Sequence, residues 1–155
     1  MSRIVRATTA HVGPIAMLMG NSPLLRRYRV TARGAKASLA EAIRQRDMVL
    51  VAVDGDAVLG FAWVIVTRAL DRAAYLRLLI VAETHQSRGI GAALLARAER
   101  EARAARCRHL VLLVTKTNRR ARSFYERQGY AHVGDLAGFV RPGIAESLYL
   151  KSWRT

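Results

Sequence analysis

The chain has 155 residues, of which 52% are hydrophobic and 24% are charged; this excludes a mainly disordered protein and predicts one globular domain over residues 1–155. Lys and Arg number 26 against 11 Asp and Glu, so the formal net charge at pH 7 is +15. The single cysteine excludes a disulfide framework and predicts a cytoplasmic protein, and no apolar run approaches the ~18 residues of a membrane span.

The basic residues are scattered along the chain. Arg contributes 23 of them and Lys 3. A nucleic-acid-binding protein more often gathers basic residues on one element, with aromatic residues between them for stacking. The scatter instead predicts a positive field that attracts anionic metabolites, so we do not expect nucleic acid as the main partner.

The first third of the chain predicts one strand and two helices. Residues 4–7 read as a short strand, and apolar residues recur at helical spacing over 11–19 and 31–46. Gly20 to Pro23 ends the first helix. The basic segment 24–34 predicts a mobile connection between the two helices.

The middle of the chain predicts an antiparallel meander. Apolar runs at 48–53 and 58–67 flank Asp54-Gly55-Asp56, a tight-turn signal that predicts a hairpin, and 75–81 is expected as a third strand. Beyond it the apolar spacing predicts a helix at 89–105, a buried strand at 109–115, a helix at 119–128 and final strands at 131–134 and 147–153.

The connection between the strand ending at Val81 and the helix near Gly89 is the most informative segment. Backbone N–H groups at a helix N-terminus lack partners and carry partial positive charge. Gly89 and Gly91 let a ligand approach this backbone, and Arg88 adds a formal charge. The segment therefore predicts a phosphate-bearing ligand. It lacks the Walker Gly-Lys-Ser/Thr, and Leu94 replaces the third glycine of the dinucleotide fingerprint.

Two motifs resemble those of the GNAT superfamily of acyl-coenzyme A-dependent N-acetyltransferases. Gln86, Gly89 and Gly91 match its Q/R-x-x-G-x-G/A, and residues 118–130 match its N-x-x-A-x-x-F-Y-E-x-x-G-F/Y. The order of predicted elements agrees over nearly the whole chain. The resemblance implies an α/β (α+β) fold with a mixed, mostly antiparallel sheet of six to seven strands, four helices, and splayed fourth and fifth strands.

The resemblance also implies that acetyl-coenzyme A is the co-substrate. In this family the pantetheine arm pairs with the backbone of the fourth strand, and the pyrophosphate lies on the loop and first helical turn that follow. Carried onto this sequence, the cofactor-binding residues are Leu79, Ile80, Val81, Gln86, Ser87, Arg88, Gly89, Ile90, Gly91 and Ala92. By analogy Asn118 contacts the arm, although it equally fits a helix N-cap.

Acetyl transfer to an amine needs two proton movements. An alkyl amine has a pKa near 10.4, so only about one in 2,500 is neutral at pH 7. Tyr125 matches the family's tyrosine near the sulfur and is expected to protonate the coenzyme A thiolate. Leu113 stands where some relatives carry a glutamate base. We therefore expect direct attack with water-relayed proton loss and catalysis mainly by positioning.

Other candidate groups keep two interpretations. Glu83 and His85 fit a solvated loop better than a base, and His132 or Glu146 could reach the site from the last strands. Arg77 either binds a carboxylate or phosphate of the acceptor or faces solvent.

Cysteine and histidine give no sign of further chemistry. The four His residues lack metal-ligand spacing, so no metal is expected. Cys107 lies between two arginines, which favours a thiolate, but its position predicts a buried helix terminus.

The acceptor is expected to be a small-molecule amine, neutral or anionic, because the positive charge repels polycations. One alternative is acetylation of a protein N-terminus or lysine. Another is a non-catalytic acyl-coenzyme A-binding, regulatory or nucleic-acid-binding domain. Relatives often form homodimers, and the sequence leaves the oligomeric state open.

Overall fold

The computed structural model describes residues 1–154. Its seven strands are, in chain order, β1 (Arg3–Arg6), β2 (Met48–Asp54), β3 (Ala57–Val66), β4 (Ala74–Val81), β5 (His109–Thr115), β6 (Ala131–Arg141) and β7 (Ile144–Ser152). They form a sheet in the order β1-β2-β3-β4-β5-β7-β6. Neighbours β1–β2, β2–β3, β5–β7 and β6–β7 are antiparallel, whereas β4 and β5 are parallel. The chain divides into two compact units. Unit 1 comprises Met1–Ile65 and Leu78–Glu101, and unit 2 comprises Val66–Arg77 and the chain from Ala102 onward. The expected mixed, mostly antiparallel fold is confirmed.

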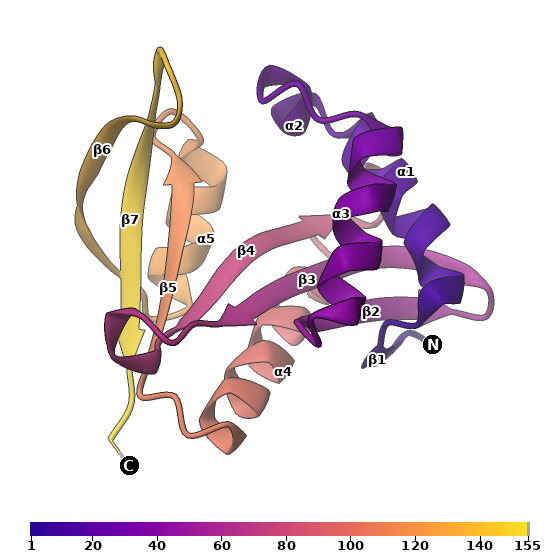
Figure 1. Ribbon diagram of the computed structural model, residues 1–155, viewed down its shortest axis with the longest axis horizontal. Coiled ribbons are helices and arrows are strands. Elements are labelled where there is room, and N and C mark those ends of the chain that lie inside the picture. Colours follow the sequence, from indigo (N-terminus) through magenta and orange to yellow (C-terminus); the bar gives the residue numbers. More distant parts are fainter. Residues whose placement is uncertain (155) are drawn as a thin grey trace. The chain divides into compact units, whose positions relative to one another are not determined.

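Unit 1 is built from the N-terminal strands and helices. Two of its strands form the predicted hairpin, with Gly55 at φ +58 in the turn. Helices α1 and α3 contact each other, and α3 also contacts β2 (Figure 1). The elements are β1 (Arg3–Arg6), α1 (Val12–Asn21), α2 (Pro23–Arg27), α3 (Ala32–Arg44), β2 (Met48–Asp54), β3 (Ala57–Val66), β4 (Ala74–Val81) and α4 (Ile90–Ala104). The last residue of β3, the first half of β4 and the end of α4 belong to unit 2.

The core of unit 1 lies between these helices and strands. Periodic apolar residues of α1 and α3 are buried against alternate residues of β2 and β3. The indole of Trp63 packs in this core while its Nε1 donates to Asp47 Oδ2 at 3.0 Å. Gly60 permits close packing on β4, because a Cβ there would lie 2.8 Å from Ile80 O. This contact fixes the part of β4 that precedes the candidate site.

Unit 2 contains the C-terminal strands and one helix, α5. Side chains of β7 and α5 interact directly, as described below. The elements are β5 (His109–Thr115), α5 (Arg119–Arg127), β6 (Ala131–Arg141) and β7 (Ile144–Ser152). Short 3-10 turns occur at Thr9–His11, Leu70–Arg72 and Glu83–His85. No helix within residues 1–154 is long and apolar enough to cross a membrane.

Two sequence-based expectations about elements are wrong. The segment 24–34 is not simply a connection: it contributes most of α2, which Ser22 caps by accepting from Leu25 N at 3.3 Å. The described chain thus has five α-helices where four were expected. The last two strands are longer than predicted, because Pro142 and Gly143 alone separate β6 from β7 and Gly143 adopts φ +82.

Candidate functional site

The parallel ladder between β4 and β5 is short. The parallel ladder joins Ala74–Leu76 of β4 to Leu110–Leu112 of β5 and continues no further within residues 1–154. Ile80 packs against the core of unit 1, while Leu79 and Val81 are half-buried. These three residues therefore lie on a strand segment that is anchored on one face and lacks a β5 partner at its edge.

The loop after β4 turns sharply before α4 begins. Ser87 and Gly89 have φ of +62 and +80, in the left-handed region that favours glycine. Gln86 Nε2 donates to Val81 O at 3.1 Å, so the side chain ties the loop back to the strand. This bond gives Gln86 a positioning role in the loop that the sequence motif alone did not reveal.

The first turn of α4 presents unpaired backbone donors. The first amide of the turn with an intrahelical acceptor is Ala93 N, which donates to Gly89 O at 3.0 Å. The amides of residues 88–92 have no acceptor in the described chain. Ile90, 8% exposed, anchors the turn in the core, whereas Ser87, Arg88 and Gly89 are exposed. Unit 1 thus brings the predicted strand and loop residues together around open N–H groups.

Unit 2 carries the remaining predicted residues. Asn118 caps α5, its Oδ1 accepting from Ala121 N at 3.2 Å. The capping interpretation of Asn118 is therefore confirmed. Its side-chain NH2 has no acceptor within residues 1–154, so a second contact through nitrogen is open to it.

Tyr125 has a buried ring and an available hydroxyl. It is 8% exposed and packs edge-on against Phe124 and Tyr130, with ring centroids 5.1 and 5.7 Å away. Its hydroxyl has no partner in the described chain, and no fully buried side-chain oxygen there is unsatisfied, so the hydroxyl touches solvent. Burial raises the pKa of Tyr125 above its usual value of 10. The phenol therefore keeps its proton at neutral pH.

A hydrogen-bond network fixes α5 on β7. The hydroxyl of Tyr149, which is fully buried, donates to Glu126 Oε1 at 2.8 Å and accepts from Arg122 Nε at 3.0 Å. Arg122 also donates to Lys116 O at 3.1 Å. The sequence analysis missed Tyr149 and Arg122. The four-residue spacing of Arg122 and Glu126 on α5 is visible in the sequence, but their bonds to Tyr149 depend on how α5 packs on β7.

Several polar side chains interact on the face of the unit 2 sheet toward α5. His132 and Asp135 lie on the α5 face, where His132 Nε2 is 2.9 Å from Asp135 Oδ1. Ser147 Oγ donates to the same oxygen at 2.6 Å, and Lys116 Nζ pairs with the other at 3.3 Å. The Ser147 and His132 hydrogen bonds, with a contribution from Lys116, hold the pKa of Asp135 well below its usual range.

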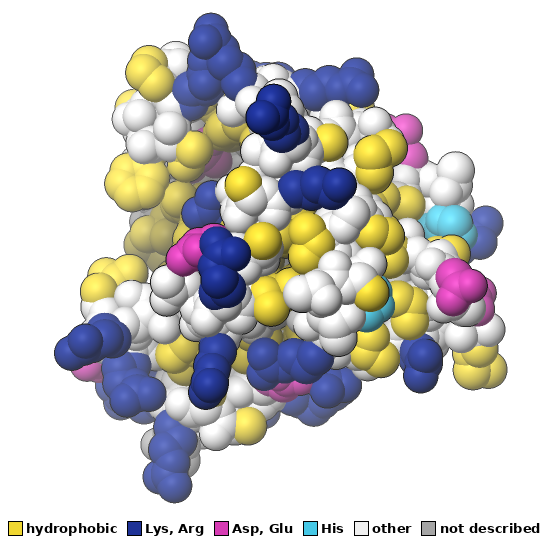
Figure 2. All heavy atoms as spheres, turned by 45° about the vertical axis from the view of Figure 1, so that its right-hand side comes forward, with side chains coloured by type: hydrophobic (Ala, Val, Ile, Leu, Met, Phe, Trp, Pro, Cys, Tyr) yellow, Lys and Arg dark blue, Asp and Glu magenta, His cyan; other side chains and the backbone are white. Residues whose placement is uncertain are grey.

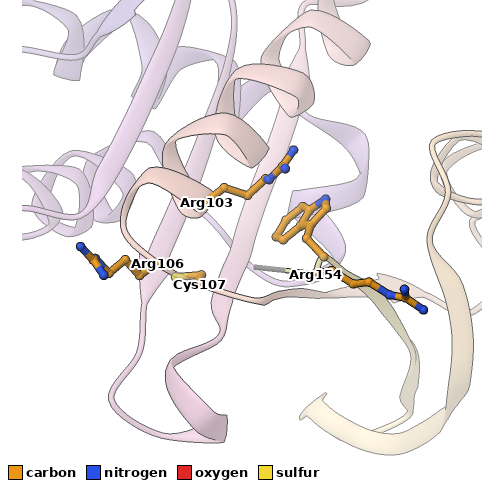
Figure 3. Close-up of a pocket in the computed structure, with 5 residues that line it drawn as sticks. Arg103, Arg106, Cys107 and Arg154 are labelled. Carbon is orange, nitrogen blue, oxygen red and sulfur yellow. The ribbon is translucent and has the colours of Figure 1, made fainter.

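A hollow of about 610 Å³ at the end of α4 involves the single cysteine. The guanidinium of Arg103 lies over the ring of Trp153, with its Cζ 5.9 Å from the ring centroid. In Figure 3, Arg106 and Arg154 point away from Arg103. The guanidinium groups do not converge. Cys107 is 2% exposed, and burial raises the pKa of its thiol, so the buried helix terminus is confirmed.

Basic side chains are dispersed and acidic ones form no metal cluster. On the face shown in Figure 2, Lys and Arg are interspersed with apolar and neutral groups. No group of three or more His, Cys, Asp or Glu in residues 1–154 could hold a metal ion. Glu83 is exposed, and His85 Nδ1 lies 2.9 Å from Thr84 Oγ1.

Comparison with known proteins gives one sequence family and many shared folds. Residues 22–130 match the sequence model of the acetyltransferase (GNAT) family. The ribosomal-protein-alanine N-acetyltransferase of Brucella melitensis is 21% identical, with 97% of this chain and 99% of that chain covered and a TM-score of 0.81. No curated protein sequence matches the chain significantly.

Two similar structures contain coenzyme A. An aminoglycoside 6'-N-acetyltransferase complexed with coenzyme A is 17% identical, with 97% and 96% of the two chains covered and a TM-score of 0.81. The PaiA N-acetyltransferase of Thermoplasma acidophilum, also in complex with coenzyme A, is 16% identical, with 99% of each chain covered and a TM-score of 0.79. At these identities the likeness is one of fold.

Proposed function

Because the chain belongs to the GNAT family of acetyltransferases and is an acyltransferase, we propose that it transfers an acetyl group from acetyl-coenzyme A to a primary amine of a small-molecule acceptor by direct attack. The open amides in the first turn of α4 carry this proposal. They offer hydrogen-bond donors and partial positive charge to a diphosphate, and the exposed Arg88 adds a full charge. Two proteins of the same fold hold coenzyme A.

The cofactor contacts proposed for unit 1 fit an extended ligand with a diphosphate. Leu79, Ile80 and Val81 offer backbone groups along the β4 edge, so their side chains need no particular chemistry. Residues 86–92 form the loop proposed for the diphosphate, in which the main-chain N–H groups of 88–92 are the donors. The side-chain amide of Asn118 is proposed to contact the arm. When bound, acetyl-coenzyme A supplies an activated acyl group and a thiolate leaving group.

Tyr125 is proposed as the proton donor to that thiolate. A thiol has a pKa near 8.5 and a phenol near 10, and burial raises the latter further. The phenol therefore remains protonated at neutral pH and can donate a hydrogen bond to sulfur as negative charge develops there. Because burial makes the phenol a weaker acid than the thiol, a proton that it gives to sulfur has to be restored from water. Its hydroxyl has no hydrogen-bond partner among residues 1–154, which supports this role, since no acceptor there has to be displaced first.

The proposed acceptor is a small amine that is neutral or carries an anionic group. The net charge of +15 disfavours the approach of a polycation. Arg77 is exposed on β4 and is proposed to bind a carboxylate or phosphate of the acceptor. Proteins of this fold include enzymes named for an aminoglycoside and for a ribosomal-protein alanine, so the fold itself does not select the acceptor.

A thiol-release assay tests this function. The protein is incubated with acetyl-coenzyme A and a panel of alkyl amines, amino acids, amino-acid amides, an aminoglycoside and peptides with free N-termini. We expect amine-dependent thiol release that is fastest with a small, non-polycationic amine. Faster acetylation of the peptides would favour the protein-acceptor alternative. No release above the amine-free rate with any amine would contradict the proposed function.

A further inference from the structure

Glu146 carries the only buried carboxylate among residues 1–154. It lies near the start of β7, and its side chain is 3% exposed. Burying a carboxylate costs free energy unless partners compensate. Every buried side-chain nitrogen and oxygen in residues 1–154 has a hydrogen-bond partner. The carboxylate of Glu146 is therefore buried together with hydrogen-bond partners from the protein.

The strand register places Glu146 on the sheet face opposite α5. Glu146 pairs with Thr115 of β5, while its neighbour Ser147 faces the α5 side with Asp135. Tyr75 of β4 pairs with Val111, which lies on the same face of β5 as Thr115. Arg77 follows Tyr75 by two residues and shares this face. Unit 2 thus carries Tyr75, Arg77 and Glu146 on one side of its sheet.

Electrostatics shows that the three side chains share one environment. Burial is the main cause of the raised pKa of Tyr75; the Arg77 charge opposes this rise and the Glu146 charge adds to it. Tyr75 therefore senses both the cation and the carboxylate. From β6, the residue that pairs with Glu146 is the apolar Leu136. Tyr75 and Arg77 are the titratable groups of β4 on this side of the sheet, and His109 of β5 alternates onto the same face.

The register also separates the two candidate bases of the last strands. His132 lies on the α5 face, bonded to Asp135 and in ring contact with Tyr149 at 5.3 Å. Tyr125 belongs to α5, so it too comes from that side of the sheet. Glu146 is on the other side, together with Arg77. An acid and a base approaching one reacting centre from opposite faces can serve the thiolate and the amine separately.

We propose that Glu146 is the catalytic base that binds the acceptor ammonium and removes its proton, with Arg77 beside it holding an anionic group of the same acceptor. The proposal rests on the proposed N-acetyltransferase function. It narrows the acceptor to small molecules that combine an amine with a carboxylate or phosphate. The ammonium would replace one of the present hydrogen-bond partners of Glu146.

The proton and bond changes balance without another reactant. The ammonium gives a proton to the Glu146 carboxylate, and the free amine lone pair then forms the C–N bond to the thioester carbonyl carbon. Glu146 passes this first proton to water and then takes the second proton of the attacking nitrogen, so that the nitrogen becomes the amide. The C–S bond breaks, and the thiolate takes a proton from Tyr125. Glu146 releases its second proton to water and Tyr125 takes one back from water, so both groups return to their starting states and one proton is released overall.

Two amines of different basicity, each carrying a carboxylate elsewhere in the molecule, test the proposal with Glu146→Gln. At pH 7 an alkyl amine of pKa near 10.4 is neutral in about one molecule in 2,500, whereas an α-amino group of pKa near 7.8 is neutral in about one in 7. We expect the variant to lower kcat/KM for the alkyl amine by about 10²–10⁴-fold. The loss for an α-amino amide should be at least tenfold smaller, since that amine needs a base less.

The controls separate this role from a structural one. Glu41→Gln removes an exposed carboxylate of α3 that pairs with Arg44, and it should leave both rates unchanged. Acetyl-coenzyme A affinity, measured by calorimetry, should not change in Glu146→Gln. If circular dichroism shows that this variant is unfolded, Glu146→Asp replaces it, with the same expectation of a larger loss for the alkyl amine.

Each outcome decides between the two proposals. Equal losses for both amines, or a loss below about threefold for the alkyl amine, overturn the assignment of Glu146 while the proposed function stands. A wild-type protein that acetylates neither these amines nor any in the wider panel overturns the function, and the role of Glu146 with it.

Discussion

The side chain of Tyr125 shows how burial and access can be combined in one residue. Its ring packs between Phe124 and Tyr130, yet its hydroxyl has no partner in residues 1–154. The hydrogen bonds of Tyr149 to Glu126 and Arg122 hold α5 against β7. They thereby fix the helix that carries the phenol of Tyr125. The sequence motif could identify Tyr125, but this supporting network depends on contacts 23 and 27 residues apart along the chain.

Replacing Tyr125 by phenylalanine removes the proton donor and keeps the ring. We expect Tyr125→Phe to lower kcat by about 10²-fold or more, because the thiolate then leaves without a positioned proton donor. Acetyl-coenzyme A affinity, measured by calorimetry, should stay within about threefold. Tyr130→Phe, on the neighbouring buried ring, is the matched control and should retain turnover; an equal loss in both variants would argue against the assigned role.

Asp135 makes stability depend on pH. Its folded-state pKa is lowered, chiefly by the Ser147 and His132 hydrogen bonds, so its stabilising effect is present above the unfolded pKa of about 3.9. That effect is lost as the pH falls through the folded pKa. In urea denaturation, Asp135→Asn should be less stable than the wild type at pH 7, and the gap should shrink as the pH falls below about 4. A gap that is constant with pH would refute this.

The sequence alone could not distinguish Glu146 from His132 as a candidate base. The sequence offered His132 and Glu146 as equivalent candidates near the last strands. Only the register separates them, because alternation sends His132 to the α5 face and Glu146 to the opposite one. A one-residue slip would exchange the faces, so no argument from spacing alone could decide.

At the scale of elements, predictions were most accurate where the apolar period was strong. The strand His109–Thr115 has the predicted bounds, and the hairpin around Gly55 is as expected. The errors lie where the local signal is weak. Helix α2 is only five residues long and ends in two arginines. Strand β6 is mostly exposed and contains Gly134 and Gly138. Neither element therefore shows the periodicity on which such predictions depend.

The loop before α4 yields a prediction with a built-in control. Gly89 and Gly143 adopt φ of +80 and +82, and a Cβ at either meets nothing within 4 Å. Substitution by valine therefore has the same backbone cost at both positions. We expect both variants to lose similar stability in thermal denaturation, and only Gly89→Val to bind acetyl-coenzyme A at least tenfold more weakly in calorimetry. Unchanged affinity in Gly89→Val would remove the loop from the binding site.

At the scale of the whole molecule, the two units share three continuous elements. The divisions after Ile65, Arg77 and Glu101 fall inside β3, β4 and α4, rather than in flexible linkers, where domain boundaries are usual. We therefore propose that residues 1–155 form a single domain. Unfolding one unit alone would disrupt β3, β4 and α4, because each of these elements belongs to both units.

This continuity predicts cooperative unfolding. Scanning calorimetry should show one transition with equal calorimetric and van't Hoff enthalpies. Near-ultraviolet and far-ultraviolet circular dichroism should give coincident curves. Two resolved transitions would show that the units fold as separate domains.

The central claim is that amide hydrogens at the start of α4 bind the diphosphate of acetyl-coenzyme A. Titration of ¹⁵N-labelled protein with coenzyme A tests it most directly, with dephosphorylated pantetheine as the control ligand. We predict that coenzyme A produces its largest amide shifts at residues 88–92 and that pantetheine leaves these amides nearly unchanged. Binding of coenzyme A with unshifted amides at residues 88–92 would contradict the claim.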